Sequence, residues 1–576
     1  MKYNQQILEA FDRLGFSPRA GQIAAVNQIL IEFIDNSVKN VVLSAPTGTG
    51  KSIIGAVTAE ALSSVLGAGA GSLKSSISLV STNTLATQYA TTFDALKGAS
   101  QYVMIKGANN YTCSALSTDG VVETADSCAW WAMTQAGKEF SGTLETECGR
   151  CDYLASKKQK NSTRHLTTNY SYFFIDRLYT EKFEPRDLVI WDEAHLINDL
   201  FSEHAAIVFS QQRLQATARE LSETLHLVDP EIARLTLRLA QDIGDGKINQ
   251  NNYRTYLNSI FKVYRWAQET GEAAAGRALR SSRMGEYSRL VKFTKKYEGL
   301  LCKIDDLFNY NYAHVFDHDA AAATVSIKPI FVSRMFEALR CSPRNLFMSA
   351  TIDLDFMVTT LSLDPAQSKF IKLPATIDPA HKQVIFFDPQ SLSYNSLQDP
   401  AVVTRLRKNC ARIVKKHVGM GERGIILSPS FKLQEQLVQE LRTLKPAVQM
   451  FVHEQGTPLG PVLDAFKAWN QGAAVLISPS IYEGIDLPHE LSRFQVIVKA
   501  PFPSLADRRF KFILDNYNSI YTSMATMKLV QGAGRSVRAQ DDHARTYMLD
   551  SNAQRLFTAP ANIWKNEFDV QFTNFL

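Results

Sequence analysis

The sequence predicts an α/β protein with two doubly wound parallel sheets. A glycine-rich turn at residues 45–52 follows an apolar run, an apolar strand at 187–191 ends in two carboxylates, and the second half alternates apolar strands with helix-length spacers. This alternation is typical of parallel sheets covered by helices. A chain of 576 residues is long enough for two to four domains, each with its own core.

The glycine-rich turn has the pattern of a phosphate-binding loop. It reads Ala45, Pro46, Thr47, Gly48, Thr49, Gly50, Lys51 and Ser52. Position 45 is Ala where the strict pattern has Gly, but the glycines needed for close backbone approach, Gly48 and Gly50, are present. Backbone N–H groups of such a turn point at phosphates. We expect Lys51 to reach the β- and γ-phosphates of ATP and Ser52 to ligate Mg²⁺.

The second element is the apolar strand at 187–191, which ends in Asp192 and Glu193. A carboxylate at the tip of a parallel strand beside a phosphate loop can hold Mg²⁺, and its neighbour can orient and deprotonate the attacking water. We therefore expect Asp192 to be the metal ligand and Glu193 the general base. Two interpretations of His195 stay open, a relay to the second domain and a structural hydrogen bond.

Further β segments predict the second sheet; they lie at residues 345–348, 424–427, 474–477 and 494–498. After them come Gln531, Arg535 and Arg538, and the two arginines would share one face of a helix. A planar guanidinium can stabilise charge on a transferring γ-phosphate. These three residues are the expected contribution of the second domain to a shared catalytic site.

Four of the seven cysteines fall close together: Cys113, Cys128, Cys148 and Cys151. Their spacing is C-x14-C-x19-C-x2-C, which is compatible with a tetrathiolate metal site. Spacing alone makes Zn²⁺ the default and leaves an iron–sulfur cluster open. Four unrelated buried thiols are the structural alternative.

Composition and charge are those of an ordinary globular protein, with 45% hydrophobic and 21% charged residues. A net charge of +5 permits a nucleic-acid partner without arguing for one alone. The first residues lack the apolar core of a signal peptide, and no apolar run of membrane-spanning length occurs. We expect a cytoplasmic protein, nucleoid-associated or equivalent.

Taken in order, these motifs resemble those of superfamily 2 helicases, and their detail resembles the XPD/DinG family of iron–sulfur DNA helicases. Residues 106–113 look like the opening of that family's iron–sulfur domain, and residues 151–153 followed by 169–172 look like its exit. The segment 192–195 is similar to the family's DEAH box, and 349–351 to the motif that follows it.

The resemblance extends to nucleotide contacts before and after the central motifs. Residues 16–22 resemble the element that contacts adenine, and residues 482–486 resemble a motif that couples the nucleotide to the DNA path. The resemblance therefore adds four expected nucleotide contacts: Arg19, Gln22, Gly484 and Asp486.

The resemblance implies two RecA-like motor domains and an ATP-dependent enzyme that moves 5′→3′ on single-stranded DNA and unwinds duplex. It replaces zinc by a [4Fe–4S] cluster on the four clustered cysteines and implies ATP and Mg²⁺ at the motor site. The expected partners are single-stranded DNA and single-strand/duplex junctions, with repair or replication proteins around a monomer.

The expected organisation has a metal-cluster insertion and a helical arch insertion in the first motor domain. The first motor domain takes residues 1–105, 169–200 and 336–380, the iron–sulfur domain 106–168, the arch 201–335, and the second motor domain 381–576. Three alternatives stay open: a DNA-dependent ATPase that remodels nucleoprotein without strand separation, an RNA helicase, and a non-enzymatic nucleic-acid scaffold. The intact ATP-site residues argue against the scaffold.

Basic and aromatic side chains on both insertions are candidates for DNA contact. They are Lys157, Lys158, Lys160 and Arg164, the basic run Arg277, Arg280, Arg283, Arg289, Lys292, Lys295 and Lys296, and the aromatic residues Tyr111, Trp130, Trp131 and Tyr153. A solvated helix face for the charges and a small-domain core for the rings are the alternative interpretations.

Overall fold

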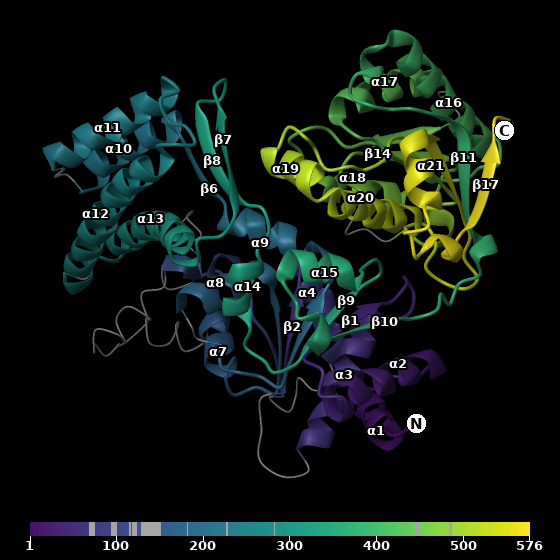
Figure 1. Cartoon of the computed structure of the whole chain (residues 1–576), viewed down its shortest axis with the longest axis horizontal. Coiled ribbons are helices and arrows are strands. Elements are labelled where there is room, and N and C mark those ends of the chain that lie inside the picture. The colour runs from purple at the N-terminus through teal and green to yellow at the C-terminus, as the bar shows by residue number, and fades with distance from the viewer. Residues whose placement is uncertain are drawn as a thin grey trace.

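The computed structural model describes residues 1–67, 75–93, 101–113, 117, 124–127, 151–180, 183–225, 229–281, 283–444, 448–482 and 487–575. These residues form two seven-stranded sheets whose strands are all parallel and one three-stranded antiparallel sheet. The two parallel sheets confirm the predicted fold class. In Figure 1 the first sheet lies at the bottom, the second at the upper right, and the antiparallel sheet with its helices at the upper left.

The first sheet has the strand order β10-β1-β9-β5-β2-β4-β3. Its strands are β1 (Asn40–Ser44), β2 (Ser76–Val80), β3 (Tyr102–Met104), β4 (His165–Asn169), β5 (Leu188–Asp192), β9 (Asn345–Ser349) and β10 (Ser368–Lys372). Its covering helices are α1 (Asn4–Leu14), α2 (Ala20–Leu30), α3 (Lys51–Leu66), α4 (Asn83–Ala90), α7 (Asp152–Gln159), α8 (Tyr170–Ile175), α14 (Ser333–Leu339) and α15 (Leu354–Leu361).

Helices cover both faces of this sheet, which explains its continuous apolar strands. In β1, Val41 and Leu43 pack into the core that contains α1, α2 and α3, whereas Val42 packs into the core on the opposite face. All three side chains are fully buried. The β1 strand therefore packs against a core on each of its faces immediately before the phosphate loop.

The second sheet has the order β13-β14-β12-β15-β16-β11-β17. Its strands are β11 (Lys382–Gln390), β12 (Gly424–Leu427), β13 (Gln449–Val452), β14 (Ala474–Ser478), β15 (Phe494–Ile497), β16 (Ala544–Asp550) and β17 (Asp569–Thr573). Its helices are α16 (Pro400–Val418), α17 (Phe431–Leu441), α18 (Leu459–Ala468), α19 (Arg508–Asn516), α20 (Asn518–Ala533) and α21 (Ser551–Thr558). The chain crosses from the first sheet to the second between Lys372 and Lys382.

The segment expected to be a helical arch contains three strands as well as helices. It contains α9 (Ile197–Ala205), α10 (Gln211–Leu225), α11 (Pro230–Gly244), α12 (Tyr253–Arg280) and α13 (Met284–Tyr310), but also β6 (Ile207–Ser210), β7 (His314–Asp319) and β8 (Thr324–Pro329). The segment is mainly helical, as predicted, but its three strands were not predicted. In β8 the buried residues Val325 and Ile327 alternate with more exposed neighbours, the period-two pattern of a strand with one buried face.

The helices of the described ranges include none long and apolar enough to cross a membrane. The domain boundaries given above stay a prediction.

Candidate nucleotide site

The phosphate loop joins β1 to α3, and its two central glycines have backbone conformations that other residues rarely adopt. Gly48 has φ 84° and Gly50 has φ 79°. A Cβ atom at Gly48 would lie 2.8 Å from the carbonyl oxygen of Arg538, and one at Gly50 would lie 2.5 Å from Nε2 of Gln22. Both positions therefore require glycine, for the turn itself and for what packs against it.

Two residues from the start of the chain hold the outside of this loop. Gln22 donates from Nε2 to the carbonyl oxygen of Thr49 at 3.0 Å, and Arg19 donates from Nη1 to that of Gly48 at 3.5 Å. Gln22 is 4% exposed. The structure thus brings both predicted nucleotide contacts to the phosphate loop.

The two carboxylates lie at the end of β5, opposite the phosphate loop. Lys51 Nζ is 3.7 Å from Oε1 of Glu193, and Glu193 itself has a left-handed backbone conformation with φ 50°. The hydroxyl of Tyr170 donates to the carbonyl oxygen of Asp192 at 2.7 Å, and the buried ring of Trp191 lies directly before it in the strand. These contacts hold the turn that aims the carboxylates at Lys51.

The surroundings give the two carboxylates different protonation behaviour. Burial and the adjacent charge of Glu193 raise the pKa of Asp192 to about 7. Burial opposes ionisation of Glu193 as well, but Lys51, His195 and the Ser349 hydroxyl lower its pKa below the ordinary value. Glu193 is therefore ionised at neutral pH, as a general base must be.

One feature of Asp192 fits a divalent cation. Its Oδ1 atom is buried and has no hydrogen-bond partner among the described residues. Since a buried carboxylate oxygen is normally satisfied, a cation such as Mg²⁺ would complete the site. Ser52, at the second position of α3, is the other predicted ligand.

A chain of hydrogen bonds crosses from the carboxylates to the second sheet's domain. Gln531 on α20 donates from Nε2 to Nε2 of His195 at 3.1 Å. His195 then carries its proton on Nδ1 and donates to Oγ of Ser349 at 2.9 Å. Ser349 donates in turn to Oε2 of Glu193 at 3.1 Å.

The ring of His195 links Gln531 to Ser349, and both interpretations of His195 stay predictions. Ser349 is not among the predicted site residues. Its hydroxyl contacts both His195 and Glu193, and the small, polar residue at the end of β9 is the sequence signal that could have indicated it.

The two arginines lie near the site but not on a helix. Helix α20 ends at Ala533, so the prediction that Arg535 and Arg538 share a helix face was wrong. The helix stops because Gly532 and Gly534 are poor helix formers and no apolar period continues. Arg535 donates to the carbonyl oxygen of Tyr482, and its charge is among those that lower the pKa of Glu193.

Arg538 lines a cleft between the two sheet domains. The cleft has a volume of about 690 Å³. One side is formed by Arg19, Gln22, Gly48 and Thr49, and the other by Arg538, Ala539, Gln540 and Asp541, with Leu373, Pro374, Thr376 and Ile377 of the connecting segment between them. The connecting residues were not predicted as site residues. Gly484 and Asp486 lie outside the described residues.

The structure describes two of the four cysteines of the predicted metal cluster. Cys113 is buried and Cys151 is partly exposed, while Cys128 and Cys148 lie outside the described residues, as do Trp130 and Trp131. The rings of Tyr111 and Tyr153 lie 5.3 Å apart, so the segments that carry Cys113 and Cys151 are in contact. Within the described ranges no group of three or more His, Cys, Asp and Glu residues has metal-binding geometry.

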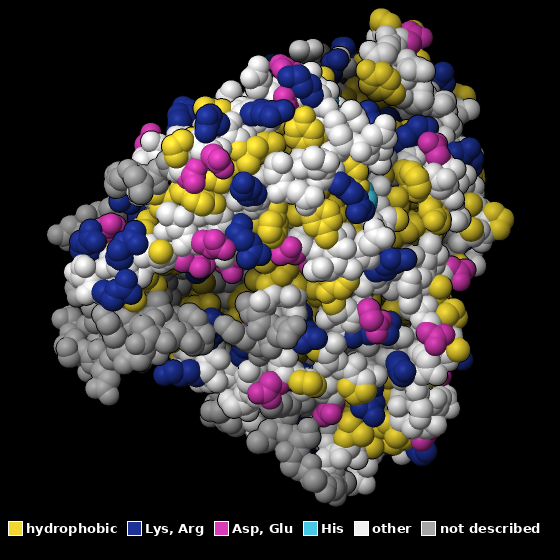
Figure 2. Space-filling model, turned by 60° about the vertical axis from the view of Figure 1, so that its left-hand side comes forward, with side chains coloured by type: hydrophobic (Ala, Val, Ile, Leu, Met, Phe, Trp, Pro, Cys, Tyr) yellow, Lys and Arg dark blue, Asp and Glu magenta, His cyan; other side chains and the backbone are white. Residues whose placement is uncertain are grey.

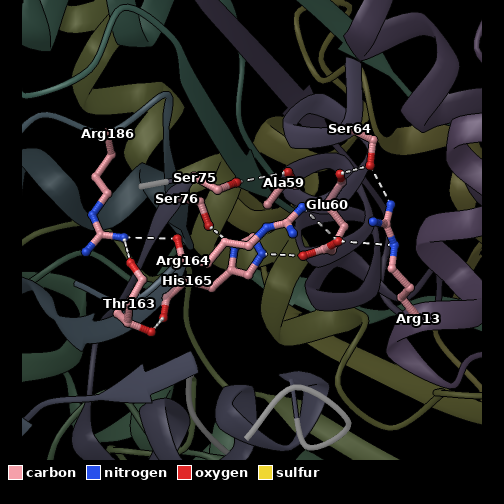
Figure 3. A network of polar contacts seen from close by, with 10 residues as sticks. All are labelled: Arg13, Ala59, Glu60, Ser64, Ser75, Ser76, Thr163, Arg164, His165 and Arg186. Atoms are coloured by element: carbon pink, nitrogen blue, oxygen red, sulfur yellow. Dashed lines mark hydrogen bonds and ion pairs between the residues drawn. The ribbon is translucent and has the colours of Figure 1, made fainter. Parts of the chain in front are cut away.

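Two basic residues proposed for DNA contact are structural instead. Lys160 is 3% exposed and its Nζ lies 2.7 Å from Oδ1 of Asp176. Arg164 donates to Oε2 of Glu60 at 3.2 Å within the polar network drawn in Figure 3. The sequence showed the charges but not these partners.

Part of the basic run on α12 and α13 is also paired. Arg283 lies 2.5 Å from Glu286, and Lys296 pairs with Glu220. On the face shown in Figure 2, Lys and Arg side chains are interspersed with Asp and Glu and form no continuous stripe. Local geometry alone therefore does not assign a nucleic-acid surface.

Comparison with known proteins finds two family models and a DNA helicase that resemble this chain. The family model described as "Helicase C-terminal domain" matches residues 412–561, and "Type III restriction enzyme, res subunit" matches residues 15–219. The chain is 22% identical over 609 residues to the ATP-dependent DNA helicase YoaA of Escherichia coli K12, an alignment that covers 93% of this chain and 92% of YoaA.

Solved structures agree on the fold. A structure of an XPD helicase superposes with a TM-score of 0.65 at 15% identity, covering 97% of this chain and all of that one. Xpd4 of S. tokodaii superposes with a TM-score of 0.59 at 14% identity, covering 96% of this chain. Together with the site between two parallel sheets, these matches support an XPD/DinG-like superfamily 2 helicase.

Proposed function

We propose that the protein is an ATP-dependent DNA helicase that moves 5′→3′ along single-stranded DNA and separates the duplex ahead of it. The observation that supports a motor driven by ATP is the hydrogen-bonded chain from Glu193 through Ser349 and His195 to Gln531. The polarity follows from the family resemblance. The hydrogen-bonded chain joins the carboxylate expected to activate water to the second motor domain. A nucleotide-driven movement of one domain would therefore change the hydrogen bonds that reach the catalytic carboxylate, Glu193.

In this mechanism ATP binds in the cleft between the two motor domains. The phosphate loop and Lys51 bind the phosphates, and Arg19 and Gln22 border the adenine side. Asp192 and Ser52 would hold Mg²⁺, which supplies neutralising charge at the β- and γ-phosphates. Glu193 accepts the proton of the attacking water.

Closure of the cleft completes the site. Arg535 and Arg538 approach the γ-phosphate, and Gln531 stays in contact with His195. Hydrolysis separates the γ-phosphate from ADP, and its departure removes the charge that holds the domains together, so that the cleft reopens. Each cycle then advances the motor along the strand, with Gly484 and Asp486 in the proposed coupling segment.

We also propose that Cys113, Cys128, Cys148 and Cys151 hold a [4Fe–4S] cluster, with Zn²⁺ as the alternative. The support is the family resemblance and the contact of Tyr111 with Tyr153 beside two of the four thiols. A rigid metal-stapled insertion would stand at the duplex junction. The domain boundaries given above belong to the same proposal.

The test is strand displacement on partial duplexes with either a 5′ or a 3′ single-stranded tail. Unmodified protein is expected to displace the strand from the 5′-tailed DNA, with ATP, and Lys51→Ala is expected to abolish both displacement and hydrolysis. Displacement only from the 3′-tailed substrate would overturn the polarity. Equal hydrolysis by Lys51→Ala and unmodified protein would overturn the nucleotide site.

The same assay separates the alternatives. DNA-stimulated hydrolysis without displacement would favour a translocase that remodels nucleoprotein. Stimulation by single-stranded RNA but not by DNA of the same sequence would favour an RNA helicase.

A further inference from the structure

The segment after α21 carries a tryptophan that reaches into the first motor domain. Trp564 is 2% exposed, and its indole Nε1 donates to Oγ of Ser44 at 3.0 Å. Ser44 is the last residue of β1 and directly precedes the phosphate loop. The two residues are 520 positions apart in the chain, so the contact belongs to the tertiary structure alone.

Ser44 passes this contact on to a second catalytic segment. Its hydroxyl donates to the carbonyl oxygen of Ala350 at 3.4 Å. The backbone N–H of Ala45 donates to the carbonyl oxygen of Ser349 at 2.9 Å. The indole therefore contacts the place where the phosphate loop and the Ser349 segment are hydrogen-bonded to each other.

The loop that presents Trp564 is held by its own hydrogen bonds. The backbone N–H of Trp564 donates to Oδ1 of Asn562 at 3.0 Å, and Nδ2 of Asn562 donates to the carbonyl oxygen of Phe557 at 2.8 Å. Asn562 is 1% exposed. The indole is thus fixed to the end of α21 and moves with the second motor domain.

A second contact runs beside the indole. Lys372, the last residue of β10, donates to the carbonyl oxygen of Ile563 and lies 3.6 Å from Oε1 of Glu567. Residues 563–567 therefore rest on the ends of two neighbouring strands of the first sheet, β10 and β1. A strand end is where a parallel sheet positions its catalytic loops.

We propose that Trp564 is a positioning residue for ATP hydrolysis, which sets the phosphate loop and the Ser349 segment according to the position of the second motor domain. It acts through Ser44 and touches neither nucleotide nor water. The inference rests on the proposed ATPase function. It adds a domain contact that none of the motif residues Gln531, Arg535 and Arg538 provides.

A purely structural tryptophan and a positioning tryptophan differ in what their loss changes. Loss of a structural side chain lowers stability, but the molecules that remain folded turn over normally. Loss of a positioning contact lowers kcat in folded protein, because the loops spend less time in the reactive arrangement. The KM for ATP changes little, since the residue does not touch the nucleotide.

The test compares Trp564→Phe with Trp469→Phe. Both variants lose one indole hydrogen bond, but Trp469 donates from Nε1 to the carbonyl oxygen of Gly472 at 3.1 Å, within the second domain. DNA-stimulated kcat, KM for ATP, DNA affinity and the unfolding temperature are measured for each. Trp564→Phe is expected to lower kcat about threefold to tenfold, the effect of one buried hydrogen bond, while Trp469→Phe stays within a factor of two of the unmodified protein.

A double-mutant cycle with Ser44→Ala tests the route of the effect. If Trp564 acts through the Ser44 hydroxyl, Trp564→Phe lowers kcat less in the Ser44→Ala background than in the unmodified protein. Equal effects in both backgrounds, or a kcat for Trp564→Phe equal to that of Trp469→Phe, would overturn the proposal.

The failure of the proposed function would look different. Lys51→Ala hydrolysing ATP as fast as the unmodified protein would remove the nucleotide site itself. If Lys51→Ala abolished ATP hydrolysis but Trp564→Phe kept the kcat of the unmodified protein, only the positioning role of Trp564 would be excluded.

Discussion

At the scale of single residues, Glu193 shows how the site prepares a carboxylate for proton transfer. It directly follows the buried strand β5, where desolvation favours the neutral acid. Lys51, His195 and the Ser349 hydroxyl together keep it ionised. Lys51 also lowers the pKa of the neighbouring Asp192, but burial and the charge of Glu193 outweigh this effect and raise the pKa to about 7. Two adjacent carboxylates thus acquire different chemistry from their partners.

The first prediction concerns this base. Glu193→Gln keeps the shape and the hydrogen bond from Ser349 but accepts no proton. ATP hydrolysis should fall by about 100-fold or more, the usual contribution of a general base, while binding of a fluorescent ATP analogue persists. Loss of nucleotide binding together with hydrolysis would contradict the assignment.

A matched control for this variant is Glu337→Gln. Glu337 lies on α14, and its side chain is 70% exposed and paired with Arg340. An exposed pair contributes little to stability. Hydrolysis by Glu337→Gln should therefore equal that of the unmodified protein.

At the scale of elements, a buried polar network holds α3 against the first sheet (Figure 3). Glu60 on α3 accepts from Nε2 of His165 at 2.5 Å, and Ser76 on β2 donates to Nδ1 of the same ring at 2.8 Å. Burial lowers the pKa of His165 below its usual 6.5, against the opposing effect of Glu60. The network therefore contains a neutral imidazole and an ionised Glu60.

The second prediction is that the contribution of His165 to stability is lost in acid. His165 stays neutral in the folded protein at pH values where the unfolded chain takes up a proton. Its contribution is complete above about pH 6.5 and falls as the pH decreases. His204, with a pKa lowered to about 4, and His314 and His417, both lowered by burial, act in the same direction. Asp192 and Asp306, whose pKa values are raised to about 7 and about 6, act in the opposite direction. The histidine contribution is therefore measured by comparing a variant with the unmodified protein at pH 5 and at pH 7.5.

The variant His165→Gln removes one of these titrations. Its unfolding temperature should be below that of the unmodified protein at pH 7.5, and this difference should be smaller at pH 5. His543→Gln, at an exposed position, serves as the control and should follow the unmodified protein at both pH values. A difference between His165→Gln and the unmodified protein that is as large at pH 5 as at pH 7.5 would contradict the prediction.

A second element contact joins α19 of the second motor domain to the insertion in the first. Arg509 is 2% exposed; it donates from Nε to the carbonyl oxygen of Ile330 at 3.1 Å, and its Nη2 lies 2.9 Å from Oδ1 of Asp199. Arg508, the residue before it, pairs with Asp317 at 2.8 Å, but its side chain is 61% exposed. The two neighbouring arginines thus form one buried and one exposed contact with the same insertion.

The third prediction compares these two arginines. Arg509→Ala leaves a buried carbonyl group without its donor and should lower the free energy of unfolding by about 1–3 kcal/mol. Arg508→Ala should lower it by less than about 1 kcal/mol, as for other exposed ion pairs. Denaturant unfolding of both variants measures the difference. Equal effects would show that burial of Arg509 does not determine the strength of the contact.

At the scale of the whole molecule, the two sheet domains line one cleft. The phosphate loop and carboxylates come from the first sheet, and Gln531, Arg535 and Arg538 from the second. A site divided in this way works only when the domains come together, which is what a motor requires.

The fourth prediction concerns the proposed cluster. Anaerobically purified protein should be brown and contain about four irons per chain. Cys113→Ser should lose iron and strand displacement but keep part of the DNA-stimulated hydrolysis, because the nucleotide site lies in the motor domains. A colourless protein with one zinc would identify the alternative metal, and iron-free protein with full displacement would make the cluster dispensable.

The sequence by itself determined the motor class of this protein, because short-range chemistry defines it. A phosphate loop needs Gly48, Gly50 and Lys51 at fixed spacing. An apolar run followed by Asp192 and Glu193 indicates a buried strand with carboxylates at its end. The two parallel sheets follow from the same local alternation. Each of these signals depends on residues that are neighbours in the chain.

Only the tertiary structure decided the contacts between distant segments. In the structure Arg535 and Arg538 lie beyond the end of α20. Lys160 and Arg164 form ion pairs with Asp176 and Glu60. Trp564 contacts Ser44. A charge or an indole has the same appearance in the sequence whether it faces solvent, a carboxylate or another domain. Its partner is set by packing over hundreds of residues, which no local pattern contains.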